Sequence, residues 1–266
     1  VLRPFTATAT SRAALNLPEA PYLFLCMFDE LSGFERKNPL GMIDAYGRAF
    51  PDDDGKTGLI IKVRSLSPDK RALIEAAIGT RRSIALRLGE VAGEEVAGLT
   101  AHCDALLSLH RAEVFGLVIA EAMQAGKPVV ATAWSGNLDF MTPDTSYGVQ
   151  FKSYRLADAL GPYAAGTEWA EPDLDHAAAL MRALVADPDA GRATGARAQA
   201  HIKAHRQAYR GPPASYRRPK RNRRTAPQAK NIAHQNLTAA CADPGTGEKR
   251  DPLSATLFRI AGPARL

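Results

Sequence analysis

Short apolar runs alternate with segments of helical periodicity from about residue 11 to residue 205. The runs are continuous rather than alternating, as expected of strands that are covered on both faces. They lie at 22–28 (YLFLCMF), 58–63 (GLIIKV), 83–88 (SIALRL), 105–110 (ALLSLH) and 128–134 (PVVATAW). The segments between them that are typical of helices are 38–50, 67–79, 93–103 and 115–126. This order predicts an α/β fold with a doubly wound, Rossmann-like parallel sheet and right-handed crossovers.

The helix expected from Phe115 has one apolar face. Its members follow the i, i+3, i+4, i+7, i+8 pattern: Phe115, Val118, Ile119, Ala122 and Met123. Glu121 lies off this stripe and shares a face with Leu117, one turn earlier. Its carboxylate can therefore point back toward the N-terminal end of the helix.

The amino-acid composition is that of an ordinary globular protein. The chain has 266 residues, of which 45% are hydrophobic and 23% charged, so one or two domains are expected. No apolar run approaches the roughly 20 residues that cross a bilayer, and the first residues lack the apolar core of a secretory signal. We therefore expect a cytoplasmic protein without a transmembrane segment. The three cysteines are widely separated and indicate neither a disulfide framework nor a metal-ligand pair.

The net charge of +6 comes from one block. Residues 203–224 hold nine of the 34 Lys and Arg and no acid, and the remaining 25 face 28 acidic residues in the rest of the chain. A basic segment with so few aliphatic residues cannot bury enough surface to fold alone, so residues 205–266 are predicted to be a disordered tail. An association with nucleic acid through this tail remains an alternative, whose hallmark would be a steep salt dependence. Tyr209 and Tyr216 give base stacking little support, so we expect no specific nucleic acid partner.

Two carboxylates flank a glycine where a strand leads into a helix. Ligands of doubly wound sheets bind beyond the carboxyl ends of the strands, where the Glu113 loop lies. A helix starting near Phe115 presents unpaired N–H groups, and Gly116 lets a phosphate approach the backbone. Glu113 and Glu121 would repel phosphate itself but can accept hydrogen bonds from sugar hydroxyls on either side of it, as in a nucleotide-sugar. The alternative is that Glu113 is a solvated loop acid and Glu121 an exposed helix residue.

Three segments resemble one enzyme family. The run 108–141 (SLHRAEVFGLVIAEAMQAGKPVVATAWSGNLDFM) is similar to the E-x7-E region of the group 1 family of retaining glycosyltransferases, which have the two-domain GT-B architecture. Residues 28–51 resemble the first strand, loop and helix of the donor-binding domain of that family, and 169–188 resemble its late helix. The resemblance covers about residues 11–200.

The resemblance implies a role for each matching position around the two acids. Glu113 would contact hydroxyls of the transferred sugar, and Glu121 would contact the ribose. The backbone N–H groups of Phe115, Gly116 and Leu117 would face the sugar and the diphosphate.

A basic pair in the loop after the first strand is implied to neutralise the diphosphate. Lys37 fits one member of the pair. Many relatives place an arginine directly after the strand, where this chain has Asp29 and Ser32, so Arg36 is a substitute for the other member.

The implied reaction is hexosyl transfer from a nucleotide-diphospho-sugar with retention of configuration. Lys37 and the helix N-terminus would stabilise the departing diphosphate, so neither a carboxylate nucleophile nor a metal or other cofactor is required. The histidines are scattered and form no metal constellation. His110 either lines the cleft or has a structural role, and the loop 134–137 is expected near the sugar.

The resemblance also predicts the domain organisation. Residues 1–10 would be a remnant or linker, 11–204 the nucleotide-sugar-binding domain and 205–266 the basic tail. The N-terminal domain that binds the acceptor in the family would then lie on another chain or a longer precursor, with a glycan, a lipid or a small molecule as acceptor. A catalytically inactive fragment that binds the nucleotide-sugar is the alternative.

Overall fold

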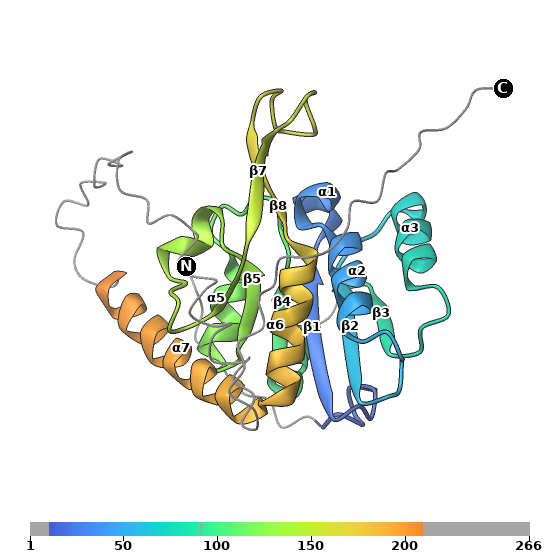
Figure 1. Ribbon diagram of the computed structural model, residues 1–266, viewed down its shortest axis with the longest axis vertical. Coiled ribbons are helices and arrows are strands. Elements are labelled where there is room, and N and C mark those ends of the chain that lie inside the picture. Colours follow the sequence, from blue (N-terminus) through green and yellow to red (C-terminus); the bar gives the residue numbers. More distant parts are fainter. Residues whose placement is uncertain (1–10, 91, 210–266) are drawn as a thin grey trace, which may run out of the picture.

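Six parallel strands form one sheet in the computed structural model, which describes residues 11–90 and 92–209 (Figure 1). Their order across the sheet is β3-β2-β1-β4-β5-β6. The strands are β1 (Tyr22–Phe28), β2 (Thr57–Val63), β3 (Ile84–Leu88), β4 (Ala105–Ser108), β5 (Val129–Thr132) and β6 (Tyr147–Val149). The predicted α/β fold with a doubly wound parallel sheet is confirmed, and the order reverses between β1 and β4.

Helices cover both faces of this sheet. One face carries α2 (Pro39–Ala49), α3 (Pro68–Ile78) and α6 (Leu174–Ala186), and the other α4 (Gly93–His102), α5 (Leu117–Gln124) and α7 (Pro188–Tyr209). Alternate residues of each strand enter the two cores, so Phe24 and Cys26 of β1 pack on the first face and Leu23 and Leu25 on the second. The continuous apolar runs are therefore explained by burial on both sides. No helix among the described residues has the length and apolarity to cross a bilayer.

The helix expected from Phe115 begins two residues later. Gly116 has a left-handed backbone (φ 86°, ψ 52°) and occupies the N-cap position, so α5 starts at Leu117. The predicted apolar face is confirmed, because its last three members are buried and Phe115 and Val118 pack partly buried against the same core.

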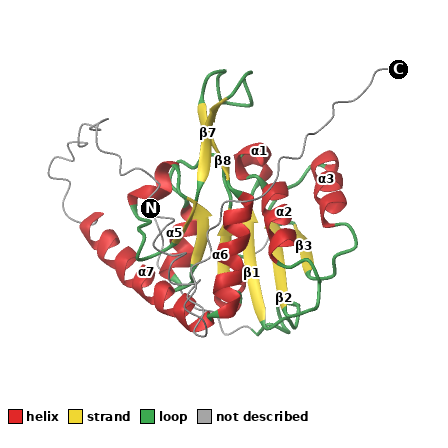
Figure 2. Cartoon of the chain, in the orientation of Figure 1, coloured by secondary structure: helices red, strands yellow, loops and turns green. Residues whose placement is uncertain are grey.

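A two-stranded antiparallel hairpin was not predicted. It consists of β7 (Phe151–Arg155) and β8 (Glu168–Pro172) and projects beyond the sheet at the end where α1 lies (Figure 2). The segment 169–188, which resembles a late helix, thus begins as a strand. The helix α6 starts only at Leu174, where the Asp173 carboxylate accepts a hydrogen bond from the His176 N–H at 2.9 Å.

The described part ends beyond the expected boundary at 204. Helix α7 continues to Tyr209, and Ile202 is buried in the core that α5 also contributes to. Residues 1–10 and 210–266, which carry the expected linker and nearly all of the expected tail, lie outside the described residues.

Candidate functional site

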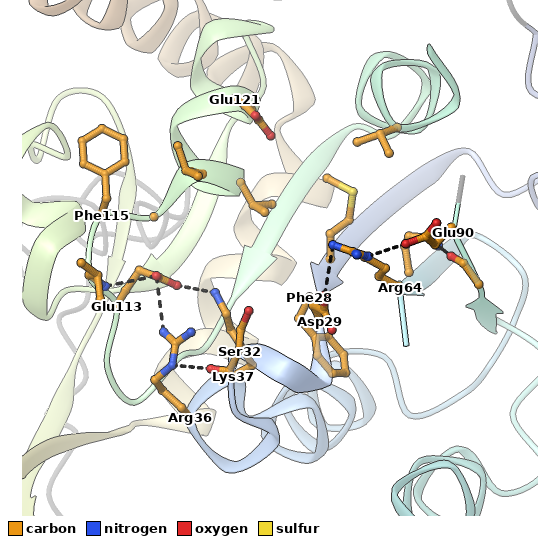
Figure 3. A pocket seen from close by; sticks show the side chains of 18 residues that line it. Phe28, Asp29, Ser32, Arg36, Lys37, Arg64, Glu90, Glu113, Phe115 and Glu121 are labelled. Atoms are coloured by element: carbon orange, nitrogen blue, oxygen red, sulfur yellow. Dashed lines mark hydrogen bonds and ion pairs between the residues drawn. The ribbon is translucent and has the colours of Figure 1, made fainter. Parts of the chain in front are cut away.

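A cavity of about 820 Å³ opens at the carboxyl ends of the strands. The seven residues predicted at the site all line it: Arg36, Lys37, Glu113, Phe115, Gly116, Leu117 and Glu121. It lies where ligands of doubly wound sheets bind, and Figure 3 shows its side chains. The structure thus brings the predicted residues together, while their individual roles stay a prediction.

The two predicted cations come from a single helical turn. Helix α1 (Phe34–Lys37) lies between Gly33, with φ 95°, and Asn38, with the left-handed φ of 54°. The Asn38 side chain fixes the end of the turn, because its Nδ2 donates to the Leu109 carbonyl at 2.9 Å and its Oδ1 accepts from the Gly41 N–H at 3.2 Å. The short turn is thereby attached to the end of β4, next to the Glu113 loop.

Arg36 and Lys37 differ in how they are held. The Arg36 guanidinium donates to the Ser32 and Ala112 carbonyls, both at 2.7 Å, and the residue is 6% exposed. The Lys37 ammonium donates to the Glu113 carboxylate. Arg36 is therefore fixed by backbone carbonyls, whereas Lys37 can exchange its carboxylate for another anion.

Glu113 forms ion pairs with both cations. Its carboxylate bonds Lys37 and lies 3.4 Å from Nη1 of Arg36, and the three side chains are 8–15% exposed (Figure 3). Burial by itself would raise the pKa of Glu113, but Lys37 and Arg36 together hold that pKa below its ordinary value. The alternative of a solvated loop acid is wrong for Glu113.

Glu121 has the opposite electrostatic environment. It lines the cavity one turn along α5, and its carboxylate forms no ion pair or hydrogen bond within the described part of the chain. Burial raises its pKa above the ordinary value. The pKa values of the two carboxylates in this cavity are thus shifted in opposite directions, which favours different roles for the two groups.

The start of α5 supplies the backbone donors. The N–H groups of the first turn have no partner within the helix and carry the positive end of its dipole. A Cβ on Gly116 would lie 3.3 Å from the Asn137 Cβ and from Ile119 Cδ1, besides requiring a left-handed residue. The glycine therefore allows both the turn and the close packing of the neighbouring loop.

That neighbouring loop holds the backbone of Glu113. The 3₁₀ turn Ser135–Asp139 follows β5, and both the Gly136 N–H at 2.9 Å and the Ser135 hydroxyl at 2.7 Å donate to the Glu113 carbonyl. Within the described part of the chain, no residue of 134–137 lines the cavity. The loop thus positions Glu113, and its place near the sugar stays a prediction.

The side chain of His110 supports this loop through its ring nitrogen Nε2. It is fully buried, and its Nε2 lies 3.0 Å from Asn137 Oδ1 and 3.2 Å from the Trp134 carbonyl. Burial lowers the pKa of His110, so the ring is neutral near pH 7 and donates through Nε2. Of its two expected roles, the structure supports the structural one.

Arg111 is a positioning residue that the sequence did not indicate. Its guanidinium donates twice to Glu171 of β8, at 2.7 and 3.0 Å, and once to the Glu35 carbonyl of α1 at 2.7 Å. Its backbone N–H donates to the Arg36 carbonyl and its carbonyl accepts from Ala170. It thus joins α1, the Glu113 loop and the hairpin, and no sequence signal links partners so far apart.

A third cation of the cavity comes from the end of β2. Arg64 directly follows β2, lines the cavity and lies 3.7 Å from Asp29, the residue that follows β1. It also pairs with Glu90 at 2.9 Å (Figure 3). Among the described residues no group of three His, Cys, Asp or Glu could hold a metal ion.

Comparisons with known proteins find one matching family model. The model of the family described as glycosyl transferases group 1 matches residues 86–199. A search of curated protein sequences finds no match.

Three solved structures share the fold. A sucrose-phosphate synthase from Thermosynechococcus elongatus is 22% identical with a TM-score of 0.56, covering 79% of this chain and 50% of its own. WaaG, a glycosyltransferase involved in lipopolysaccharide biosynthesis, is 21% identical with a TM-score of 0.54, and the match covers 72% of this chain and 45% of WaaG. HepE from Anabaena, solved with UDP and glucose, is 19% identical with a TM-score of 0.52, covering 69% and 44%.

The chain spans about half the length of these proteins. The family match includes Glu113, the start of α5 and Glu121, and the structural matches extend over most of the chain. Residues 86–199 are therefore similar to the group 1 glycosyl transferases, and the described residues have the fold of a GT-B Rossmann-like domain.

Proposed function

We propose that this chain is the donor-binding domain of a retaining glycosyltransferase. It binds a nucleotide-diphospho-sugar, and a second domain, on the same longer polypeptide or another chain, supplies the acceptor side of the site. The observation that carries the proposal is that one cavity brings together two cations, a helix N-terminus and two carboxylates. The pKa of one carboxylate is lowered and that of the other is raised. The family match and the HepE complex with UDP-glucose support the same ligand class.

Donor binding exchanges one ion pair for another. The diphosphate takes the place of the Glu113 carboxylate on Lys37, while Arg36 keeps its backbone carbonyls and the first turn of α5 donates N–H groups. The released Glu113 carboxylate then accepts hydrogen bonds from hydroxyls of the sugar. Glu121, which has no cation to satisfy among the described residues, accepts from the ribose hydroxyls.

Transfer then depends on stabilising the leaving group. The bond between the anomeric carbon and the diphosphate oxygen breaks, and the diphosphate keeps the electron pair. Lys37, Arg36 and the α5 N-terminus lie where this negative charge develops, and such fixed groups are a large source of catalysis. An acceptor hydroxyl attacks on the face that the diphosphate leaves and gives its proton to the departing diphosphate oxygen, so the sugar keeps its configuration. The positive charge comes from these protein groups, and the proposal requires no metal.

Nucleoside diphosphates should raise the melting temperature of the protein. A ligand at 100 times its Kd stabilises the folded state by about 2.7 kcal/mol, which corresponds to roughly 5–10 °C for a domain of this size. Thermal melts with a panel of nucleoside diphosphates and diphospho-sugars measure the effect, and the matching nucleosides without phosphate are the control. No shift with any diphosphate at millimolar concentration would overturn the donor-site proposal.

Activity separates a transferase from an inactive fragment. With an acceptor domain supplied, slow hydrolysis or transfer from the bound diphospho-sugar is expected, and proton NMR of the product reports the anomer. Binding without any turnover would leave the donor site in place and contradict the enzymatic part. A product with inverted configuration would contradict retention.

A further inference from the structure

Lys62 is a charged residue in an apolar strand. It lies between Ile61 and Val63 in β2, it is 5% exposed, and it lines the cavity. Its ammonium donates to the carbonyls of Gly89 and of Val63, the latter at 3.2 Å. No carboxylate forms an ion pair with it in the described part of the chain. Burial lowers the pKa of Lys62, and Glu95 partly offsets this effect.

If Lys62 had only a structural role, burying its ammonium would lower the stability of the fold without a compensating gain. An aliphatic side chain would complete the apolar run and avoid the loss of hydration of a buried ammonium. Two backbone carbonyls account for two of its three N–H groups, and the described residues provide no acceptor for the third. The third donor is thus available to a ligand in the cavity.

The position of Lys62 corresponds to one end of the expected ligand. It lies beside Met27 of β1 and Arg87 of β3 in the sheet register, whereas Glu113 follows β4 on the other side of β1. The same cavity is lined by Lys37 and Glu113 and by Glu121 and Lys62. A diphosphate at Lys37 and a ribose at Glu121 direct the base toward Lys62.

The surroundings of Lys62 suit a nucleobase. Met27 and Val96 line the cavity with apolar groups beside it, and Gly89 adds no side chain. An ammonium only donates hydrogen bonds. Uracil and guanine present a carbonyl oxygen at the position where cytosine and adenine present an amino group.

We infer that Lys62 selects a base that carries a keto oxygen at this position over one that carries an amino group. The donor is then a uridine, thymidine or guanosine diphospho-sugar rather than a cytidine or adenosine one. This inference rests on the proposed function, because it needs the diphosphate at Lys37.

Calorimetric titration with UDP and CDP tests the inference, since the two bases differ in the carbonyl or amino group at C4 and in the hydrogen on the adjacent N3. Wild type should bind UDP about tenfold more tightly, as one discriminating hydrogen bond supports. Lys62→Met should lose about tenfold in UDP affinity and keep its CDP affinity. Lys56→Met, at a 78% exposed lysine just before β2, is the control and should change neither.

The outcomes separate the inference from the proposed function. Equal or tighter binding of CDP by wild type overturns the inference and leaves the donor site standing, and this comparison does not depend on the folding of a variant. Equal losses for both ligands in Lys62→Met would show that the lysine only holds the Gly89 turn. Binding of neither UDP nor CDP, with no other diphosphate bound in the thermal panel, would overturn the proposed function itself.

Discussion

Gly136→Ala is expected to destabilise the protein by about 3 kcal/mol or more and to displace Glu113. A Cβ at this position would lie 1.9 Å from the Val114 carbonyl oxygen and 3.0 Å from that of Glu113. Overpacking a core costs typically about 1–3 kcal/mol, and here the obstacle is backbone that cannot change rotamer. Urea unfolding measures the loss of stability, and calorimetry on the remaining folded protein measures the weakened binding of the diphospho-sugar.

Two other glycines provide matched controls for this variant. Gly195→Ala would place a Cβ 2.0 Å from the Gly126 carbonyl, away from the cavity, so it should destabilise the fold without changing donor affinity. Gly93→Ala meets nothing within 4 Å and should be neutral or stabilising. Wild-type stability and affinity in Gly136→Ala would show that the loop does not hold Glu113.

Glu113→Gln is expected to lower the stability of the ligand-free protein by about 3 kcal/mol, the lower end for breaking a buried ion pair. The variant leaves Lys37 and Arg36, both largely buried, without their carboxylate. A bare nucleoside diphosphate should then bind as tightly as to wild type or more tightly, because Lys37 no longer has a competing anion. The sugar-linked form should lose affinity, since it alone uses the Glu113 carboxylate. Unfolding and calorimetry together measure these opposite effects.

The pH dependence gives the same variant a second readout. Pairing holds the pKa of Glu113 in the folded protein below its ordinary value. Its contribution to stability is therefore complete above the pKa of the unfolded chain, about 4.3, and is lost as the pH falls through the lower pKa of the folded protein. The stability difference between wild type and Glu113→Gln should therefore shrink in that acidic range. Glu121→Gln is the control: its pKa is raised by burial, so removing its charge should not destabilise the fold. In the binding experiment, an equal loss of affinity for the bare nucleoside diphosphate and for its sugar-linked form in Glu113→Gln would show that this acid is not at the sugar.

The sequence predicted most of the sheet because the physical signal was local. Strands buried on both faces leave continuous apolar runs, and β1 and β2 needed no distant information. The candidate site was predictable for a similar reason, since Glu113, Gly116 and Glu121 lie within nine residues. Lys37 required the family resemblance, because nothing in its own segment points to Glu113, a residue of a different loop.

The remaining features depend on contacts between distant segments. The hairpin strand β7 is only partly buried, and its sequence carries no continuous apolar run. The pairing of Lys37 with Glu113 joins residues 76 apart, and the bonds of Arg111 reach both α1 and β8. The requirement for glycine at 136 comes from the Val114 carbonyl, which no local pattern reveals.

Calorimetric titration of UDP into wild type and Lys37→Ala tests most directly whether this cavity holds the diphosphate of a nucleotide-sugar. A charge-assisted hydrogen bond contributes about 1.5–3 kcal/mol, so Lys37→Ala should weaken UDP and UDP-glucose alike by roughly 10- to 150-fold. Lys152→Ala, at an exposed lysine of the hairpin outside the cavity, should bind both as wild type does. Unchanged binding in Lys37→Ala, or no binding of any nucleoside diphosphate by wild type at millimolar concentration, would contradict the account.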